Sequence, residues 1–286
     1  QEDDSNRQNQ FSGRGGLNNV SATVSYQALK NISLGVDLQY NFGNIQNKSI
    51  RFEEDIQFGT REINRSDFLG FTFRLGALYD RDITENLKLT ASATYLPPTD
   101  INVENFREFA TVIVATNGQE VVSDRREETR PDTNYESPSS FSFGLGIGSQ
   151  NKWFVGAEYE NTQSGNFNNR SFREPDLDFD DSSRFKIGGY FIPKYNDVTS
   201  YLNRIVYRLG GRYEQTGINL RGEEINEFGI SFGVGVPAGR LFTNANLSFE
   251  YGQRGTTDAG LVEESFFNFI IGLSLNDKWF QQRKFN

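Results

Sequence analysis

Ten charged residues stand at alternate positions of segments whose other positions are mostly apolar. Side chains of a β-strand point to opposite faces with a period of two, so these charges are predicted to share one polar face. Both signs are present, which favours ion pairs between neighbouring strands over a ring of one sign that selects ions. The ten candidates are Asp37, Arg74, Lys88, Glu158, Lys186, Arg208, Arg212, Glu214, Glu227 and Glu250.

Two interpretations of this charged face stay open. In the first, the charges pair across strands and only hold the sheet together. In the second, they form a polar path for a solute or the seat of a plug. Arg208, Arg212 and Glu214 lie close together on one predicted strand and are the leading candidates for the second role.

The residue types needed for the commonest nucleophilic chemistry are missing. The sequence contains 0 histidine and 0 cysteine, so Ser-His and Cys-His pairs, thiolate metal sites and disulfides cannot form within it. We therefore predict that the chain is not an enzyme and uses no cofactor. Its formal net charge of −9 also argues against nucleic acid as a partner.

One acidic stretch places four carboxylates within six residues. Calcium prefers clustered oxygen ligands, but the strict spacing and central glycine of an EF-hand loop are missing here. A solvated acidic loop is therefore favoured over a metal site. The four candidate ligands are Asp176, Asp178, Asp180 and Asp181.

The elements that must carry these residues follow from a strict alternation. From Leu69 to Ala77 every second residue is apolar, and Tyr79 closes the apolar row. The pattern recurs about ten more times along the chain, and no stretch approaches about 20 consecutive apolar residues. Such segments are typical of a transmembrane antiparallel up-and-down β-barrel, apolar toward lipid and polar toward its lumen. We therefore predict an all-β protein of the bacterial outer membrane, with outer-membrane lipid as one partner.

Eleven membrane strands are predicted, joined by alternating short and long connections. The long connections, which face the cell exterior in such barrels, are expected at about 43–67, 96–140, 160–183 and 214–226. Within them, 99–139 is expected to be an extracellular insertion with a hairpin around Asn117-Gly118. The strands are expected at about 17–27, 32–42, 68–79, 87–95, 141–147, 153–159, 185–192, 205–213, 228–236, 245–251 and 267–275.

Three aromatic side chains lie beside predicted strand ends, where such rings anchor a barrel at the membrane interface: Trp153, Trp279 and Phe280. The strand count has a second consequence, because closed single-chain bacterial barrels normally have an even number of strands. We expect an odd number of strands to be missing before Gln1, so that 1–286 is a single barrel domain without its first strands. A separate N-terminal fragment is then an expected partner. The alternative is that one strand is miscounted.

Several stretches resemble the FadL/TodX-like family of outer-membrane transport proteins, in a divergent branch. The resemblance implies a complete barrel of about 14 strands with an N-terminal plug, and three strands added to the eleven would reach that number. It further implies the uptake or passage of hydrophobic or amphipathic small molecules. The alternative is a non-transporting barrel subunit of an outer-membrane secretion, assembly or surface-protein complex, with other outer-membrane or surface proteins as partners. The stretches are Gly13-Arg-Gly-Gly-Leu-Asn-Asn, Asn31-Ile-Ser-Leu-Gly-Val, Tyr207-Arg-Leu-Gly-Gly-Arg-Tyr-Glu-Gln-Thr-Gly, Glu227-Phe-Gly-Ile-Ser-Phe-Gly-Val-Gly-Val-Pro, Phe249-Glu-Tyr-Gly-Gln-Arg-Gly and Gly272-Leu-Ser-Leu-Asn-Asp-Lys-Trp-Phe.

Overall fold

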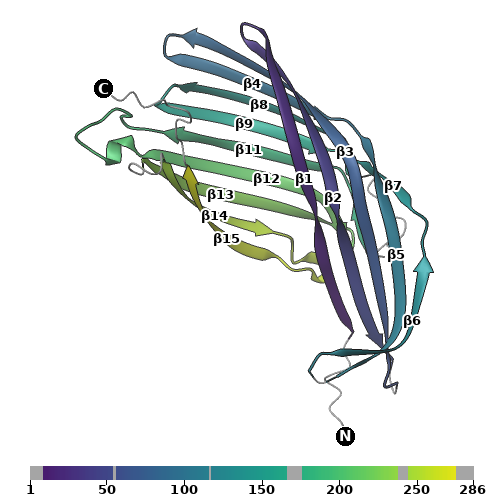
Figure 1. Ribbon diagram of the computed structural model, residues 1–286. Helices are drawn as coiled ribbons and strands as arrows, with labels where there is room; N and C mark the ends of the chain where they lie inside the picture. Colours follow the sequence, from purple (N-terminus) through teal and green to yellow (C-terminus); the bar gives the residue numbers. More distant parts are fainter. Residues whose placement is uncertain (1–8, 54–55, 116, 166–175, 238–243, 275–286) are drawn as a thin grey trace, which may run out of the picture.

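The computed structural model describes residues 9–53, 56–115, 117–165, 176–237 and 244–274, and these form an all-β protein (Figure 1). Every strand pairing among them is antiparallel. The strands are β1 (Gln10–Leu29), β2 (Ile32–Phe52), β3 (Gly59–Thr84), β4 (Leu87–Leu96), β5 (Thr99–Val114), β6 (Glu120–Thr129), β7 (Thr133–Ser137), β8 (Ser140–Ser149), β9 (Trp153–Thr162), β10 (Leu177–Phe179), β11 (Ser182–Phe191), β12 (Val206–Leu220), β13 (Glu223–Pro237), β14 (Asn244–Arg254) and β15 (Glu264–Ser274).

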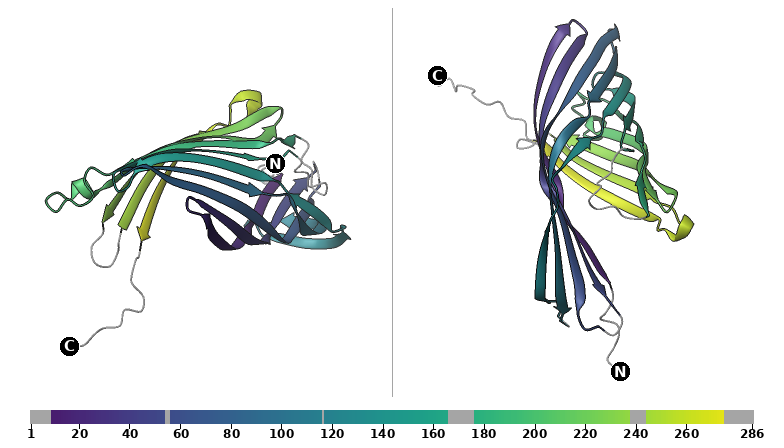
Figure 2. Two further views of the ribbon diagram at one scale, coloured as in Figure 1. Left: turned by 90° about the horizontal axis from the view of Figure 1, so that it is seen from above. Right: turned by 90° about the vertical axis from the view of Figure 1, so that its right-hand side faces the viewer.

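Eleven of these strands form one continuous path in the order β1-β2-β3-β4-β8-β9-β11-β12-β13-β14-β15. Figure 2 shows that this path curves into a trough. Within the described residues β1 pairs only with β2 and β15 only with β14, so the two edges are not joined to each other. The predicted antiparallel sheet is therefore present, whereas closure into a barrel is not seen.

The alternation in the sequence sorts side chains between the two faces of the trough. On β3, Leu69, Phe71 and Leu75 are 52%, 57% and 43% exposed on the outward face. Their neighbours across the ladder on β2 are also apolar, as in the pairs Val36↔Leu75 and Tyr40↔Phe71. A wide apolar face this exposed requires an apolar environment, because exposing so much apolar surface to water would cost free energy.

The sequence-based boundaries are wrong where strands continue beyond the apolar rows. The stretch 43–67 was expected as a long connection, but β2 and β3 stay paired as far as Phe52↔Gly59. Likewise, 214–226 is a tight turn at Arg221-Gly222, with positive φ at both residues, between two strands that extend to it. Polar residues on both faces of these extensions remove the period-two signal while the backbone ladder persists.

A second part of the sheet extends beyond the apolar rows, and we call it the projecting sheet. It consists of 10–16 of β1, 43–52 of β2 and 59–68 of β3, together with β5, β6 and β7. β5 pairs with β3 from Leu69↔Asn102 to Gly59↔Val112, and β6 and β7 pair with β5. Ile50, Ala110 and Val112 form a small buried cluster in this sheet. The described residues of 99–139 therefore belong to an ordered sheet, in which β5 and β6 stay paired up to Val114↔Glu120.

Two glycines mark the place where β1 and β2 pass from the apolar rows into the projecting sheet. Gly15 and Gly43 have φ of 116° and 146°. A Cβ added at Gly43 would lie 2.2 Å from the backbone oxygen of Gly16. Only glycine tolerates both the angle and the close approach. The sharp twist of this ribbon in Figure 2 is consistent with such a site.

The helical content of the described chain is limited to two short 3-10 turns, η2 (Leu202–Arg204) and η3 (Asp258–Gly260). No helix in the described part of the chain is long and apolar enough to cross a membrane.

Candidate functional site

The polar face of β9 to β14 carries a continuous series of ion pairs, which we call the charge ladder. On β11, Lys186 lies 2.9 Å from Glu158 of β9. Arg184, two residues earlier on β11, donates two hydrogen bonds to Glu214 of β12, each 2.7 Å long. Such a two-point pairing is the strongest geometry available to arginine and a carboxylate.

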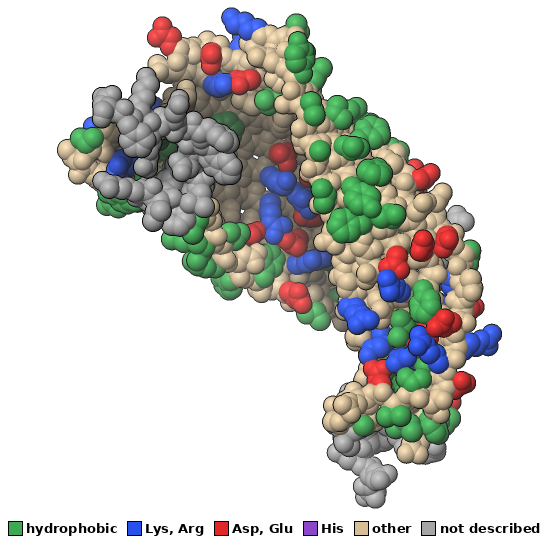
Figure 3. Space-filling model, viewed as in Figure 1, with side chains coloured by type: hydrophobic (Ala, Val, Ile, Leu, Met, Phe, Trp, Pro, Cys, Tyr) green, Lys and Arg blue, Asp and Glu red, His purple; other side chains and the backbone are tan. Residues whose placement is uncertain are grey.

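Arg212 of β12 is the centre of this ladder. Its guanidinium lies 2.5 Å from Glu227 of β13, 2.7 Å from Glu250 of β14 and 3.7 Å from Glu214. Arg254 then contacts Glu227 at 3.7 Å. Figure 3 shows basic and acidic side chains gathered in the hollow of the trough. Arg212 thus lies between three carboxylates and, together with Arg184 and Arg254, reduces their mutual repulsion across adjacent strands.

Three members of the ladder were not among the sequence candidates: Glu160, Arg184 and Arg254. Glu160 continues the parity of Glu158, and Arg184 continues that of Lys186, so the same alternation could have identified them. Glu160 and Arg184 were missed by one residue each, because one expected strand ended at Tyr159 and the other began at Phe185. Arg254 was missed because the expected strand 245–251 ended three residues before it.

The remaining charged candidates occupy the same polar face but lie outside the ladder. Asp37 accepts a hydrogen bond of 2.6 Å from Thr23 and lies opposite Arg74 in the β2–β3 register. Lys88 pairs with Asp80 at 2.6 Å near the β3–β4 turn. Arg208 donates to the side-chain oxygen of Asn246 at 3.0 Å, so its partner is an amide and not a carboxylate.

A second group of ion pairs lies in the projecting sheet. Arg61 contacts Glu108 at 2.6 Å and Glu120 at 2.8 Å, while Lys48 contacts Glu120 at 2.5 Å. Burial by itself raises the pKa of Glu120, but hydrogen bonds from Lys48 and Arg61 outweigh it and hold that pKa below its usual value. Glu120 therefore stays ionised at neutral pH and ties the start of β6 to β2 and β3.

The acidic stretch does not gather its carboxylates around one point. The side chain of Asp176 lies 3.9 Å from Arg221, and Asp181 accepts from the backbone of Gly165. Asp178 belongs to the short strand β10, and Asp180 lies 3.5 Å from the amide of Asn219. Within the described residues no group of three or more such side chains is arranged to hold a metal ion.

Of the three predicted interface anchors, only Trp153 can be placed. It is half-buried at the start of β9, opposite Phe191 of β11. Trp279 and Phe280 lie outside the described residues.

Long amphipathic strands with an exposed apolar face and a paired-charge face define this molecule as an outer-membrane barrel-type protein. Within that class the chain belongs to the BamG family, whose family model matches residues 1–286. This is a family of components of the β-barrel assembly machinery, and it places the chain in the bacterial outer membrane.

Comparison with solved structures supports the fold at low sequence identity. The chain is similar to the Pseudomonas putida toluene transporter TodX, with a TM-score of 0.59 and 17% identity, over 93% of this chain and 70% of that one. It is also similar to a Pseudomonas aeruginosa FadL homologue, with a TM-score of 0.54 and 12% identity, over 85% of this chain and 60% of that one. The chain spans only 30% and 35% of the two RagAB peptide transporter chains that it matches, with TM-scores of 0.45 and 0.47. Comparison with curated protein sequences finds no match.

These findings correct two expectations. The chain belongs to the BamG family and not to the FadL/TodX-like transport family, so the resemblance was one of barrel architecture alone. The expected role in uptake of small molecules is wrong for the same reason, and the alternative of a subunit in an outer-membrane complex is better supported. Barrel proteins with unrelated functions share the same alternating strand sequences, because the alternation follows from contact with the membrane and does not depend on function.

Proposed function

We propose that this chain is a scaffold subunit of the β-barrel assembly machinery, anchored by its amphipathic strands and binding other Bam proteins through its projecting sheet. Membership of the BamG family supports the assembly role. The paired charge ladder supports a structural use of the polar face, because its charges are already matched across strands.

The observation that carries the docking role is an exposed apolar tip at the far end of the projecting sheet. Gly59, where β3 begins, lies about 33 Å along the strand from Leu69, the nearest residue of the apolar row. The lipid that surrounds the apolar row therefore does not cover Gly59 and its neighbours. Figure 3 shows hydrophobic side chains at the lower end of the molecule. Five side chains at the far end of the projecting sheet are 42–71% exposed, namely Phe11, Ile56, Phe58, Val121 and Val122, with Val121 and Val122 on opposite faces of β6. Apolar patches of this kind mark protein contacts.

The projecting sheet is suited to hold this tip rigidly. Val122 lies opposite Val112 of β5, which lies opposite Gly59 of β3. The Lys48–Glu120–Arg61 cluster fixes the hairpin directly behind the tip. A rigid apolar surface loses little conformational entropy when a partner covers it.

The test is the size of the native complex after mild extraction from the outer membrane. Val121→Asp and Phe58→Asp are expected to release this chain from the other Bam proteins, because each places a charge in the covered patch. Ser123→Asp, at another exposed position on β6, is the matched control and should leave the complex intact. The readout is the mass of the complex by native mass spectrometry, with the amount of inserted protein as a check on folding.

The docking role fails if both tip variants insert normally and remain in a complex of unchanged mass. It also fails if Ser123→Asp releases the chain equally, because charge anywhere on β6 would then be responsible.

We propose in addition that further strands close the sheet. Unpaired backbone groups at a sheet edge are very costly in lipid, so membrane-spanning sheets are closed. β1 and β15 each carry one unpaired edge at the depth of the apolar rows. Three added strands would give about 14, an even number. The single barrel domain of 1–286, with its plug and first strands supplied separately, remains part of this proposal.

The projecting sheet is assigned to the extracellular side in the same proposal. Short turns at Lys30-Asn31, Glu85-Asn86 and 150–152 lie at the opposite end of the strands, whereas the tight turn at Arg221-Gly222 closes the extended β12–β13 pair at the same end as the projecting sheet. Short turns face the periplasm in bacterial barrels, and longer segments face the exterior. Addition of external protease to whole cells should therefore cleave the projecting sheet first.

A further inference from the structure

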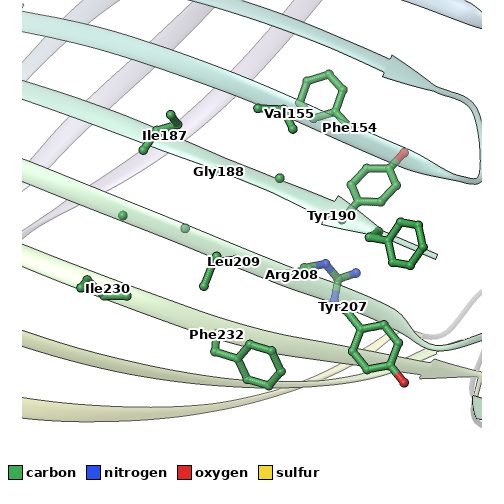
Figure 4. A pocket seen from close by; sticks show the side chains of 14 residues that line it. Phe154, Val155, Ile187, Gly188, Tyr190, Tyr207, Arg208, Leu209, Ile230 and Phe232 are labelled. Atoms are coloured by element: carbon green, nitrogen blue, oxygen red, sulfur yellow. The ribbon is translucent and has the colours of Figure 1, made fainter. Parts of the chain in front are cut away.

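We propose that the outward apolar face of β11 and β12 holds an acyl chain of an outer-membrane lipid in a defined groove. The groove has a volume of about 620 Å³ and is lined from β9, β11, β12 and β13 (Figure 4). It does not involve the projecting sheet or the charge ladder. The inference therefore stands apart from the docking role.

Two glycines on the outward face create this groove. Gly189 of β11 lies opposite Leu209 of β12, and Gly211 of β12 lies opposite Ile187 of β11. Each large side chain therefore faces an empty position on the neighbouring strand. Leu209, in the middle of the sheet, is 65% exposed.

The two glycine positions differ in whether the surrounding backbone leaves room for a side chain. A Cβ at Gly189 would lie 2.3 Å from the backbone oxygen of Phe154, so the backbone requires glycine there. At Gly211 the nearest atoms to an added Cβ lie 3.9 Å and 4.0 Å away, and its φ is not in the left-handed region. A side chain would fit, so local packing does not require the open space at Gly211.

The surroundings of the groove point to hydrocarbon as its occupant. Aromatic pairs frame it along the strands, with Phe185↔Tyr213 at one end and Phe191↔Tyr207 at the other. Six residues separate the pairs, or about 20 Å of strand. The hydrocarbon core of one leaflet is about 15 Å thick, so one extended chain can lie lengthwise between the pairs.

Water and charged ligands fit the groove poorly, because the charged residue that lines it, Arg208, donates its guanidinium N–H to Asn246 on the polar face. The outward residues of β11 and β12 between and including the aromatic pairs carry no charge: Phe185, Ile187, Gly189, Phe191, Tyr207, Leu209, Gly211 and Tyr213. Water in a cavity needs two to four polar partners, which the aliphatic middle of this row does not provide. Recognition through the acyl chain predicts little preference between zwitterionic and anionic headgroups.

The first test fills the groove in the full protein within its native complex. Gly211→Leu should reduce the lipid retained after mild extraction roughly tenfold, the effect of displacing about two methylene groups. Gly76→Leu is the matched control, because its Cβ would meet only the backbone oxygen of Gly35 at 3.9 Å and it lies on the polar face. Native mass spectrometry with added phosphatidylethanolamine or phosphatidylglycerol measures the retained lipid.

The second test uses the unsubstituted protein, so it does not depend on how a variant folds. Phosphatidylethanolamine with a photoreactive acyl chain should label peptides covering 185–191 and 207–213 well above the other outward strands. Even labelling over all outward strands would overturn the proposal. Equal lipid retention by Gly211→Leu and Gly76→Leu would also overturn it. So would loss of a protein subunit instead of lipid from Gly211→Leu, since a membrane-embedded partner would then occupy the groove.

Discussion

Arg212 shows how a single side chain organises the polar face. Its side chain contacts three carboxylates, one each from β12, β13 and β14. Its backbone belongs to β12, which pairs with β11 on one side and β13 on the other. The arginine fork suits this role because its donors point in several fixed directions at once. Without it, Glu214 and Glu227, which lie directly opposite each other in the β12–β13 register, would face each other as like charges.

At the same scale, we expect Arg212→Met to destabilise the folded sheet by about 2 kcal/mol, less than for a fully buried pair because water screens this side chain in part. The measurement is the temperature to which samples must be heated before electrophoresis for the folded band to disappear from a denaturing gel that is run cold. Arg208→Met is the control, since Arg208 contacts an amide and should have a smaller effect. Equal losses in the two variants would contradict the central role of Arg212.

At the scale of elements, the passage from the apolar rows to the projecting sheet depends on backbone geometry. Gly43→Ala should cost about 1–3 kcal/mol, because alanine is strained at a φ of 146° and its Cβ would meet the Gly16 oxygen. Gly16→Ala should be nearly neutral, since nothing lies within 4 Å of an added Cβ there. Hydrogen exchange at 10–16 of β1 reports the difference, and similar exchange in both variants would contradict this account.

The projecting sheet should also depend on pH through Glu120. The folded-state pKa of Glu120 is depressed, so its stabilising contribution is present above the ordinary value of 4.5 and is lost as pH falls through the folded value. Protection of β6 amides, corrected for intrinsic exchange, should stay constant from neutral pH down to the ordinary value of 4.5 and fall as the pH is lowered further. Glu120→Gln should lower the protection at neutral pH and reduce the pH step, and an unchanged step would refute the assignment.

At the scale of the whole molecule, the open question is how the two edge strands of the trough, β1 and β15, are joined into a closed barrel. If three strands intervene, β1 and β15 lie about 19 Å apart, which is four strand spacings. Val24→Cys combined with Ile271→Cys should then resist short cross-linkers. Val24→Cys with Val36→Cys, which are paired in the β1–β2 register, should cross-link readily. The chain has 0 native cysteines, so the readout is clean. Efficient cross-linking of the first pair would show direct closure.

The sequence by itself determined the β-strands, their two faces and the membrane setting, because burial in lipid imposes a period of two on every strand that crosses it. It identified Arg212, Glu214, Glu227 and Glu250 on one face by parity alone. Only the tertiary structure decided that these four meet in one ladder, because the strand register sets which residues face each other across neighbouring strands. Only the tertiary structure also showed that the projecting sheet exists, because 43–67 has polar residues on both faces and so gives no period-two signal. The groove at Gly211 likewise depends on which residue of β11 lies opposite it.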